Sequence, residues 1–135
     1  MGNQIEHIPP ELTTLINLEN LLLYGNCLKA IPKEIGNLIN LKTLFCHTNR
    51  IKIIAKEIGN LINLTHLFLD NNKISSLPLE ICNLTNLLQL ELSSNRLTYL
   101  PKEIDKLINL KTLSIKNNMI YQFPSHVKNI ENFTC

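Results

Sequence analysis

The stretch from Leu87 to Asn109, LLQLELSSNRLTYLPKEIDKLIN, decides how this chain folds. Its first part alternates, with apolar Leu90 and Leu92 on either side of polar Glu91, and alternation of period two indicates a β-strand. In its second part, PKEIDKLI, apolar residues recur at helical spacing over about two turns. Pro at the start of that part fits the first position of a helix. We therefore expect a strand followed by a short helix within one 23-residue unit.

The same unit recurs along the whole chain at a constant step of 23 residues. One column of asparagines stands at Asn3, Asn26, Asn49, Asn72, Asn95 and Asn118, and a second at Asn17, Asn40, Asn63, Asn86, Asn109 and Asn132. A fixed period of this size is typical of proteins built by stacking one small structural unit. We predict a single domain over residues 1–135, made of about six repeats of which the first and the last are partial.

One unit has a single apolar side and cannot fold alone, whereas stacked units bury leucine against leucine. Each buried side chain then contributes roughly 1.5–3 kcal/mol. The strands should form a parallel sheet on a concave face and the short helices should line the convex face, because helices are wider than strands. We expect the first asparagine column to satisfy buried backbone groups at the bend after each strand. The second column should provide the turn from helix to strand, where Asn tolerates left-handed backbone.

The repeated pattern L-x-x-L-x-L-x-x-N-x-L, followed by L-P-x-E-I, resembles the leucine-rich repeat family. Its 23-residue form is similar to the Ras-group-related intracellular class of plants and to repeats of bacteria, protists and large DNA viruses. The resemblance implies an α/β fold, a right-handed solenoid with a concave parallel sheet and short α or 3-10 helices on the convex side. It also implies a non-enzymatic module that binds a protein partner, as a signalling scaffold or as an effector of a pathogen or virus.

Several positions depart from the repeat pattern. Cys46 takes the place of an inward-facing strand leucine, where a small thiol can fill the core. Ala55 replaces the usual Pro, which predicts a less rigid start to that helix, and Cys82 replaces a Gly. At the end of the chain, either Phe133 begins a partial capping strand or the last repeat leaves an exposed edge.

Composition narrows the classes of function and the location of the protein. The net charge is only +2, which argues against the basic face of a nucleic-acid-binding protein and against a polybasic membrane anchor. The start MGNQIEHIPP lacks the pattern of a secretory signal, and the cysteines form no C-x-x-C pair. We therefore expect reduced thiols, an intracellular, cytoplasmic location, and no metal or cofactor.

Alternation in the strands predicts which side chains lie outward on the sheet. One outward column reads Leu22, Phe45, Phe68 and Glu91, and the next reads Tyr24, His47 and Asp70, while His66 belongs to the column before. Three apolar residues should thus meet in open water with a polar rim around them. A contiguous apolar patch with aromatic anchors is typical of a protein-binding site. The candidate partner-binding residues are Leu22, Tyr24, Phe45, His47, His66, Phe68, Asp70 and Glu91.

Two other hypotheses remain open at this stage. The chain could be a structural module that self-associates end to end, although we expect a monomer. His47 and Asp70 could be cross-strand neighbours and form a His–carboxylate pair, but no third group completes a metal or catalytic site, so a rim hydrogen bond is the expected role. An enzyme is disfavoured, because the sequence shows no pairing of nucleophile and base, phosphate-binding loop or metal cluster.

Overall fold

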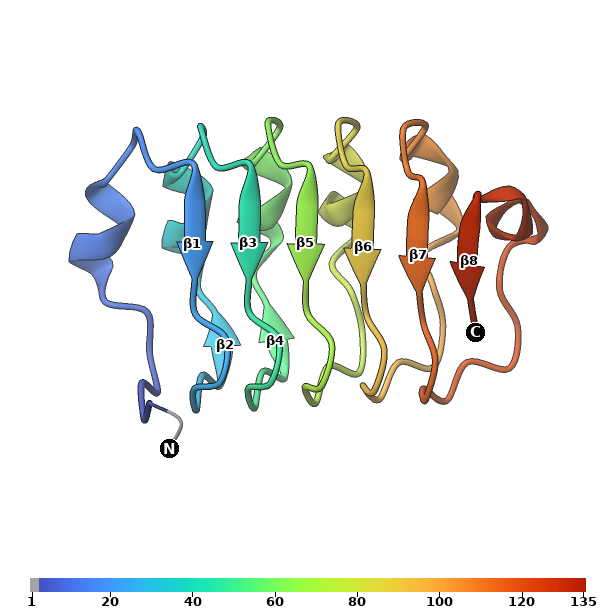
Figure 1. The fold of residues 1–135 in the computed structure, drawn as a ribbon, viewed down its shortest axis with the longest axis horizontal. Helices are drawn as coiled ribbons and strands as arrows, with labels where there is room; N and C mark the ends of the chain where they lie inside the picture. Colours follow the sequence, from blue (N-terminus) through green and yellow to red (C-terminus); the bar gives the residue numbers. More distant parts are fainter. Residues whose placement is uncertain (1–2) are drawn as a thin grey trace.

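The computed structural model describes residues 3–135 as a stack of coils with strands on one face (Figure 1). The main sheet is parallel and has six strands in the order β1-β3-β5-β6-β7-β8. These strands are β1 (Asn20–Leu22), β3 (Thr43–Phe45), β5 (His66–Phe68), β6 (Gln89–Glu91), β7 (Thr112–Ser114) and β8 (Asn132–Thr134). From β1 to β7, residues 23 positions apart pair with one another, so the predicted repeat period sets the register there, whereas β8 pairs with β7 at an offset of 20 residues.

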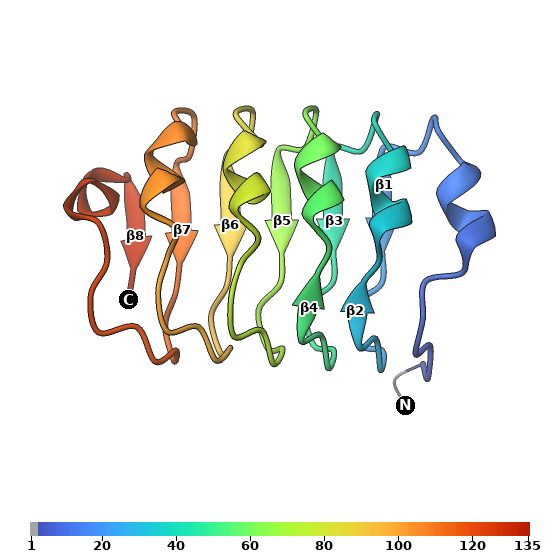
Figure 2. The ribbon, with the colours of Figure 1, turned by 180° about the vertical axis from the view of Figure 1, so that it is seen from behind.

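Short 3-10 helices lie behind the sheet, one for each repeat (Figure 2). They are η1 (Pro10–Thr14), η2 (Lys33–Asn37), η3 (Lys56–Asn60), η4 (Leu79–Asn83), η5 (Lys102–Lys106) and η6 (Ser125–Asn129). In η2 and in η4 to η6 the repeated Pro is not the first helical residue, as the sequence suggested, but the N-cap, with φ between −52° and −78° and ψ between 135° and 166°. The fold is the predicted solenoid of parallel strands and short helices. No helix of residues 3–135 combines the length and the apolar character needed to cross a membrane.

The replacement of Pro by Ala55 does not change the backbone conformation at the start of η3, and the less rigid start stays a prediction. Ala55 has φ −65° and ψ 145°, close to the φ −64° and ψ 142° of Pro78 in the next repeat. Its N–H, which a proline lacks, donates a hydrogen bond of 2.9 Å to the carbonyl of Ile31. This bond extends the pairing of β2 (Ala30–Ile31) with β4 (Ile53–Ile54), a second small parallel sheet.

Between the sheet and the helices, the leucine and isoleucine columns form one continuous core. Leu44, Leu67 and Leu90 are fully buried at equivalent positions of adjacent strands. The predicted core position of Cys46 is confirmed, and Cys82 is also buried. Neighbouring residues of a strand point in opposite directions, so the residues that alternate with these core residues point toward solvent.

The first asparagine column forms the predicted buried ladder. The Asn72 amide donates to the carbonyls of Leu69 in its own repeat and Cys46 in the preceding one, each at 3.0 Å, and its oxygen accepts the N–H of Ile51 at 2.9 Å. The same pattern holds at Asn49, Asn95 and Asn118. Asn3 is exposed, so the ladder begins at Asn26.

The prediction for the second asparagine column was right about its place, because Asn40, Asn63, Asn86 and Asn109 lie in turns between a helix and the next strand, but wrong about left-handed backbone. In the described part of the chain, the non-glycine residues with left-handed backbone are Thr48, Asn71, Ser94 and Asn117, each of which directly precedes an asparagine of the buried ladder. Asn40, Asn63, Asn86 and Asn109 are exposed, and each donates its amide to a carbonyl of the preceding repeat at 2.8–2.9 Å. Asn132 lies within β8 and not in a turn. The sharp bend falls after the strand because the chain must reverse there within a few residues.

At the C-terminal end, the alternative of a capping strand is confirmed. β8 pairs with β7, and Phe133 lies opposite Leu113. The ring of Phe133 contacts that of Phe123 edge to face, with centroids 5.2 Å apart. The half-buried Phe133 thus covers the end of the core, and the outer edge of β8 is the last edge of the sheet.

Candidate functional site

The register of the sheet brings Leu22, Phe45 and Phe68 side by side on the solvent-facing side of β1, β3 and β5. Leu22 is 59% exposed, in agreement with the predicted outward position. Phe45 and Phe68 also lie on the outer face but are half-buried, whereas the sequence predicted open exposure. The physical reason is that the two rings stack on each other, with centroids 4.7 Å apart and planes 6° from parallel.

Three further rings extend this stack into what we call the aromatic cluster: Tyr24, Phe45, His47, His66 and Phe68. Tyr24 and His47 stack with centroids 4.9 Å apart. His47 also meets the rings of Phe45 and Phe68 edge to face at 6.1 and 6.3 Å, and His66 lies nearly parallel to Phe68 at 6.5 Å. Sequence reasoning identified these residues but not the stacking. The 23-residue spacing of Tyr24 and His47, and that of Phe45 and Phe68, was the available signal, because it makes the two members of each pair cross-strand neighbours.

The polar rim of the cluster consists of Asp70 and Glu91. Asp70 Oδ2 accepts a hydrogen bond of 2.7 Å from the Asn71 amide, and Glu91 Oε1 accepts one of 2.9 Å from the Gln89 amide. The ion pairs found within residues 3–135, Lys29–Glu6 and Lys42–Glu19, lie elsewhere. Among the described residues 3–135, both carboxylates therefore have only neutral hydrogen-bond donors.

His47 and Asp70 do not form a His–carboxylate pair through Nδ1 of the imidazole. That atom is buried and has no hydrogen-bond partner. The imidazole is instead held by ring contacts with Tyr24, Phe45 and Phe68. Within residues 3–135, no group of three or more His, Cys, Asp or Glu side chains is arranged to hold a metal ion. The rim hydrogen bond of Asp70 is made with the side-chain amide of Asn71 and not with His47.

The buried thiols lie on the core side of the strands and helices, away from the cluster. Burial raises the pKa of Cys46 to about 12 and, with the nearby carboxylate of Glu103, that of Cys82 to about 11. Neither thiol is therefore ionised to an appreciable extent near neutral pH, and neither is a ready nucleophile.

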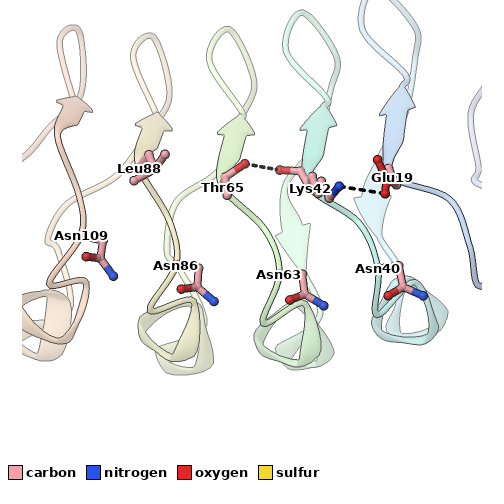
Figure 3. A pocket seen from close by; sticks show the side chains of 8 residues that line it. All are labelled: Glu19, Asn40, Lys42, Asn63, Thr65, Asn86, Leu88 and Asn109. Carbon is pink, nitrogen blue, oxygen red and sulfur yellow. Dashed lines mark hydrogen bonds and ion pairs between the residues drawn. The ribbon is translucent and has the colours of Figure 1, made fainter.

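A shallow groove of about 620 Å³ runs beside the sheet, where the chain enters the strands (Figure 3). It is lined by Glu19, Asn40, Lys42, Asn63, Thr65, Asn86, Leu88 and Asn109. The asparagine amides in it already donate to backbone carbonyls of the neighbouring repeats, and Lys42 pairs with Glu19 at 2.8 Å. This groove is thus part of the framework that joins the repeats, and the aromatic cluster remains the main candidate site.

Comparison with known proteins supports the repeat assignment. The family model described as "Leucine rich repeat" matches residues 62–120. A solved leucine-rich repeat protein of Leptospira interrogans is 35% identical over 98% of this chain, with a TM-score of 0.74. The chain is a leucine-rich repeat solenoid. It spans 41% of the length of that Leptospira protein, and no curated protein matches it.

Two plant receptors are also similar to this leucine-rich repeat solenoid. The ectodomain of the Arabidopsis thaliana receptor kinase GASSHO1/SCHENGEN3, solved in complex with CASPARIAN STRIP INTEGRITY FACTOR 2, is 31% identical over 99% of the chain, with a TM-score of 0.82. The plant peptide hormone receptor RGFR1, solved in complex with RGF2, is 27% identical over 98% of the chain, also with a TM-score of 0.82. The chain spans 18% and 22% of these two proteins. The leucine-rich repeat fold therefore serves protein and peptide recognition in these relatives, while the 23-residue intracellular subtype stays a prediction.

Proposed function

We propose that this leucine-rich repeat solenoid binds a protein partner through its sheet face, with the aromatic cluster as the contact centre. The observation that carries the proposal is the set of stacked rings that lie on β3 and β5 and just after β1 and β3. Tyr24, at the outer end of the cluster, is 52% exposed, and Leu22 beside it is 59% exposed. Aromatic side chains held rigidly by their neighbours are effective anchors, because they lose little conformational freedom when a partner binds.

Two features of the surroundings support binding as the role of this face. The rest of the sheet face is polar, with Ser93 just after β6, Ser114 on β7 and Lys116 just after β7, so the apolar area has a defined boundary. The receptors of similar fold were solved with bound partners. A signalling scaffold and a pathogen or viral effector are the finer roles that this proposal covers.

We also propose an intracellular location and a role by binding rather than by catalysis. All four cysteines are free, which suits a reducing compartment. On the sheet face, the histidine rings of the cluster are held in stacks, and the carboxylates bind neighbouring amides. This arrangement favours contact with a partner over proton transfer.

Self-association through the ends is a second candidate function. The sheet is open, so β1 and β8 each have an outer edge without a neighbouring strand of the sheet. Unpaired edges can template pairing with a further strand. Light scattering over a range of protein concentrations tests this directly, because a constant monomer mass excludes end-to-end stacking.

The proposed function is tested with two matched double variants. Phe45→Ser with Phe68→Ser removes the centre of the cluster, whereas Ile39→Ser with Ile62→Ser removes two exposed apolar side chains from equivalent positions of two repeats outside the sheet. Each variant and the unchanged chain is immobilised in folded form, as shown by circular dichroism, and used to capture proteins. We expect partners to be lost only with the phenylalanine variant.

Two results would contradict the proposal. If the isoleucine variant alone loses its partners, the contact lies on the helix-to-strand edge. If both variants retain every protein that the unchanged chain captures, the sheet face is not the binding surface.

A further inference from the structure

The two carboxylates of the rim flank one ring of the aromatic cluster. Glu91 on β6 lies directly opposite Phe68 on β5 in the parallel register, and Asp70 follows Phe68 by two residues. Strand spacing and rise per residue place the Cα atoms of Asp70 and Glu91 about 8 Å apart. On the C-terminal side of the cluster, the ring of Phe68 thus has Glu91 beside it on the neighbouring strand and Asp70 beyond it, just after its own strand.

This negative charge is not neutralised by the chain itself. Within residues 3–135, neither carboxylate takes part in an ion pair. Each accepts a single hydrogen bond, from a neutral amide, although an ionised carboxylate can accept about four. Lys116 lies in the same column as Asp70 but two strands away, about 10 Å between Cα atoms. Acceptor positions at both side chains are therefore open to a partner.

The geometry of the stack shows where a partner group would enter. The centroid spacing of 4.7 Å between Phe45 and Phe68 nearly equals the spacing of neighbouring strands, about 4.8 Å. The rings therefore stack along the axis of the solenoid. Phe45 covers one face of the Phe68 ring, and the other face is directed toward β6 and Glu91.

We propose that the partner inserts an arginine side chain beside Phe68, where its guanidinium continues the ring stack and binds the carboxylates of Asp70 and Glu91. The proposal rests on the proposed function and specifies the chemistry of the partner. A guanidinium is planar, stacks on aromatic faces and donates paired hydrogen bonds to carboxylates. An ammonium is compact and strongly hydrated, so lysine suits this place less well.

The test is a selection of random dodecapeptides displayed on phage against the full chain, followed by affinity measurements on the selected peptides as synthetic, fluorescently labelled molecules. We expect the selected sequences to be enriched in arginine. Replacing that arginine by citrulline, its neutral isostere, should weaken binding about tenfold or more. Replacing it by lysine should also weaken binding, because the ring contact is lost in part.

The same peptides are then measured against three variants of the chain at constant ionic strength. Asp70→Asn with Glu91→Gln keeps the shape of the site and should weaken arginine peptides about tenfold. Glu11→Gln with Asp105→Asn changes the net charge equally at exposed helix positions and should leave affinity unchanged. Phe45→Ser with Phe68→Ser should abolish binding.

The outcomes separate this inference from the proposed function. Peptides that need the two phenylalanines but lack arginine, or that bind the Asp70/Glu91 variant unchanged, overturn the arginine subsite and leave the sheet face as the binding surface. Equal binding of the lysine peptides, or equal weakening by the Glu11/Asp105 variant, also overturns it, because charge alone would then explain the affinity. If no selected peptide depends on the phenylalanines, or none is selected, both proposals fail.

Discussion

Replacing Asn72 by Ala should be among the most damaging polar substitutions in this solenoid. The amide is 8% exposed and lies between two repeats. Its nitrogen donates to the carbonyls of Leu69 and Cys46 at 3.0 Å, and its oxygen accepts the N–H of Ile51 at 2.9 Å. Alanine removes these bonds and supplies nothing in return.

The cost follows from which backbone groups keep a partner. The Leu69 carbonyl still accepts the Asn95 amide at 2.9 Å, and the Cys46 carbonyl still accepts that of Asn49 at 3.1 Å. Each lost bond to them should therefore cost about 0.5–1.5 kcal/mol. The Ile51 N–H, in contrast, loses the Asn72 oxygen, and an unsatisfied buried donor costs about 1–3 kcal/mol. We expect the free energy of unfolding to fall by about 2–6 kcal/mol in total, a large part of the about 5–15 kcal/mol of a typical domain.

Asn63→Ala is the matched control, because it removes the same side chain from the second asparagine column. Asn63 is exposed, and its amide donates one hydrogen bond of 2.9 Å, to the carbonyl of Ile39. Water can replace that bond, so the loss should not exceed about 1 kcal/mol. Urea unfolding followed by circular dichroism gives both values, with the m-value showing whether the repeats still unfold together.

A loss for Asn72→Ala that equals the loss for Asn63→Ala would refute this reasoning. It would mean that the buried ladder does not satisfy the backbone, or that water enters the stack at no cost. The refutation would also weaken the placement of the sheet face, since the ladder holds the bends that follow the strands of the aromatic cluster.

Three further predictions concern the stack, the thiols and the cluster. Gly59→Ala should lower the free energy of unfolding by about 1–3 kcal/mol in urea titrations. The reason is that the added methyl would lie 2.6 Å from the backbone carbonyl oxygen of Glu80 in the next repeat. An unchanged value would show that the repeats can move apart. Under native conditions at pH 8, a thiol reagent should modify exposed Cys135 at once, whereas buried Cys46, with its pKa raised to about 12, should react only on unfolding. Phe68→Ser should lower the free energy of unfolding by about 1–2 kcal/mol. Leu67→Ala, at the fully buried neighbouring residue, should lower it by about 2–5 kcal/mol. If thermal or urea unfolding showed the reverse order, the ring of Phe68 would belong to the core.

The outward position of the candidate site was predictable from local alternation. Leu44 and Leu67 are buried, and Phe45 and Phe68 beside them lie on the solvent side, as the period of two requires. The degree of exposure was not predictable. Ring stacking depends on side-chain rotamers and on the neighbouring strand, and neither is written in the alternation of one strand.

The backbone conformation at several positions was also not predictable from the sequence. The second asparagine column suggested left-handed turns, but the structure places positive φ at Thr48, Asn71 and Ser94, three different residue types at one repeat position. Composition alone could not identify that position, because the bend is imposed by stacking and not by residue preference. Ala55 likewise adopts the backbone of a proline, since the neighbouring repeats fix its geometry.

The sequence by itself determined the repeat length, the inward and outward sides of each strand and the assembly of the chain as a parallel stack, because each of these follows from which residues recur every 23 positions. Only the tertiary structure decided how side chains from different repeats meet. The stacking of Phe45 on Phe68 and the bonds of the two asparagine columns between repeats join residues about one repeat apart, and the carboxylates of Asp70 and Glu91 come from neighbouring repeats. Such contacts exist only after neighbouring coils are laid together at strand spacing, so no single repeat could reveal them.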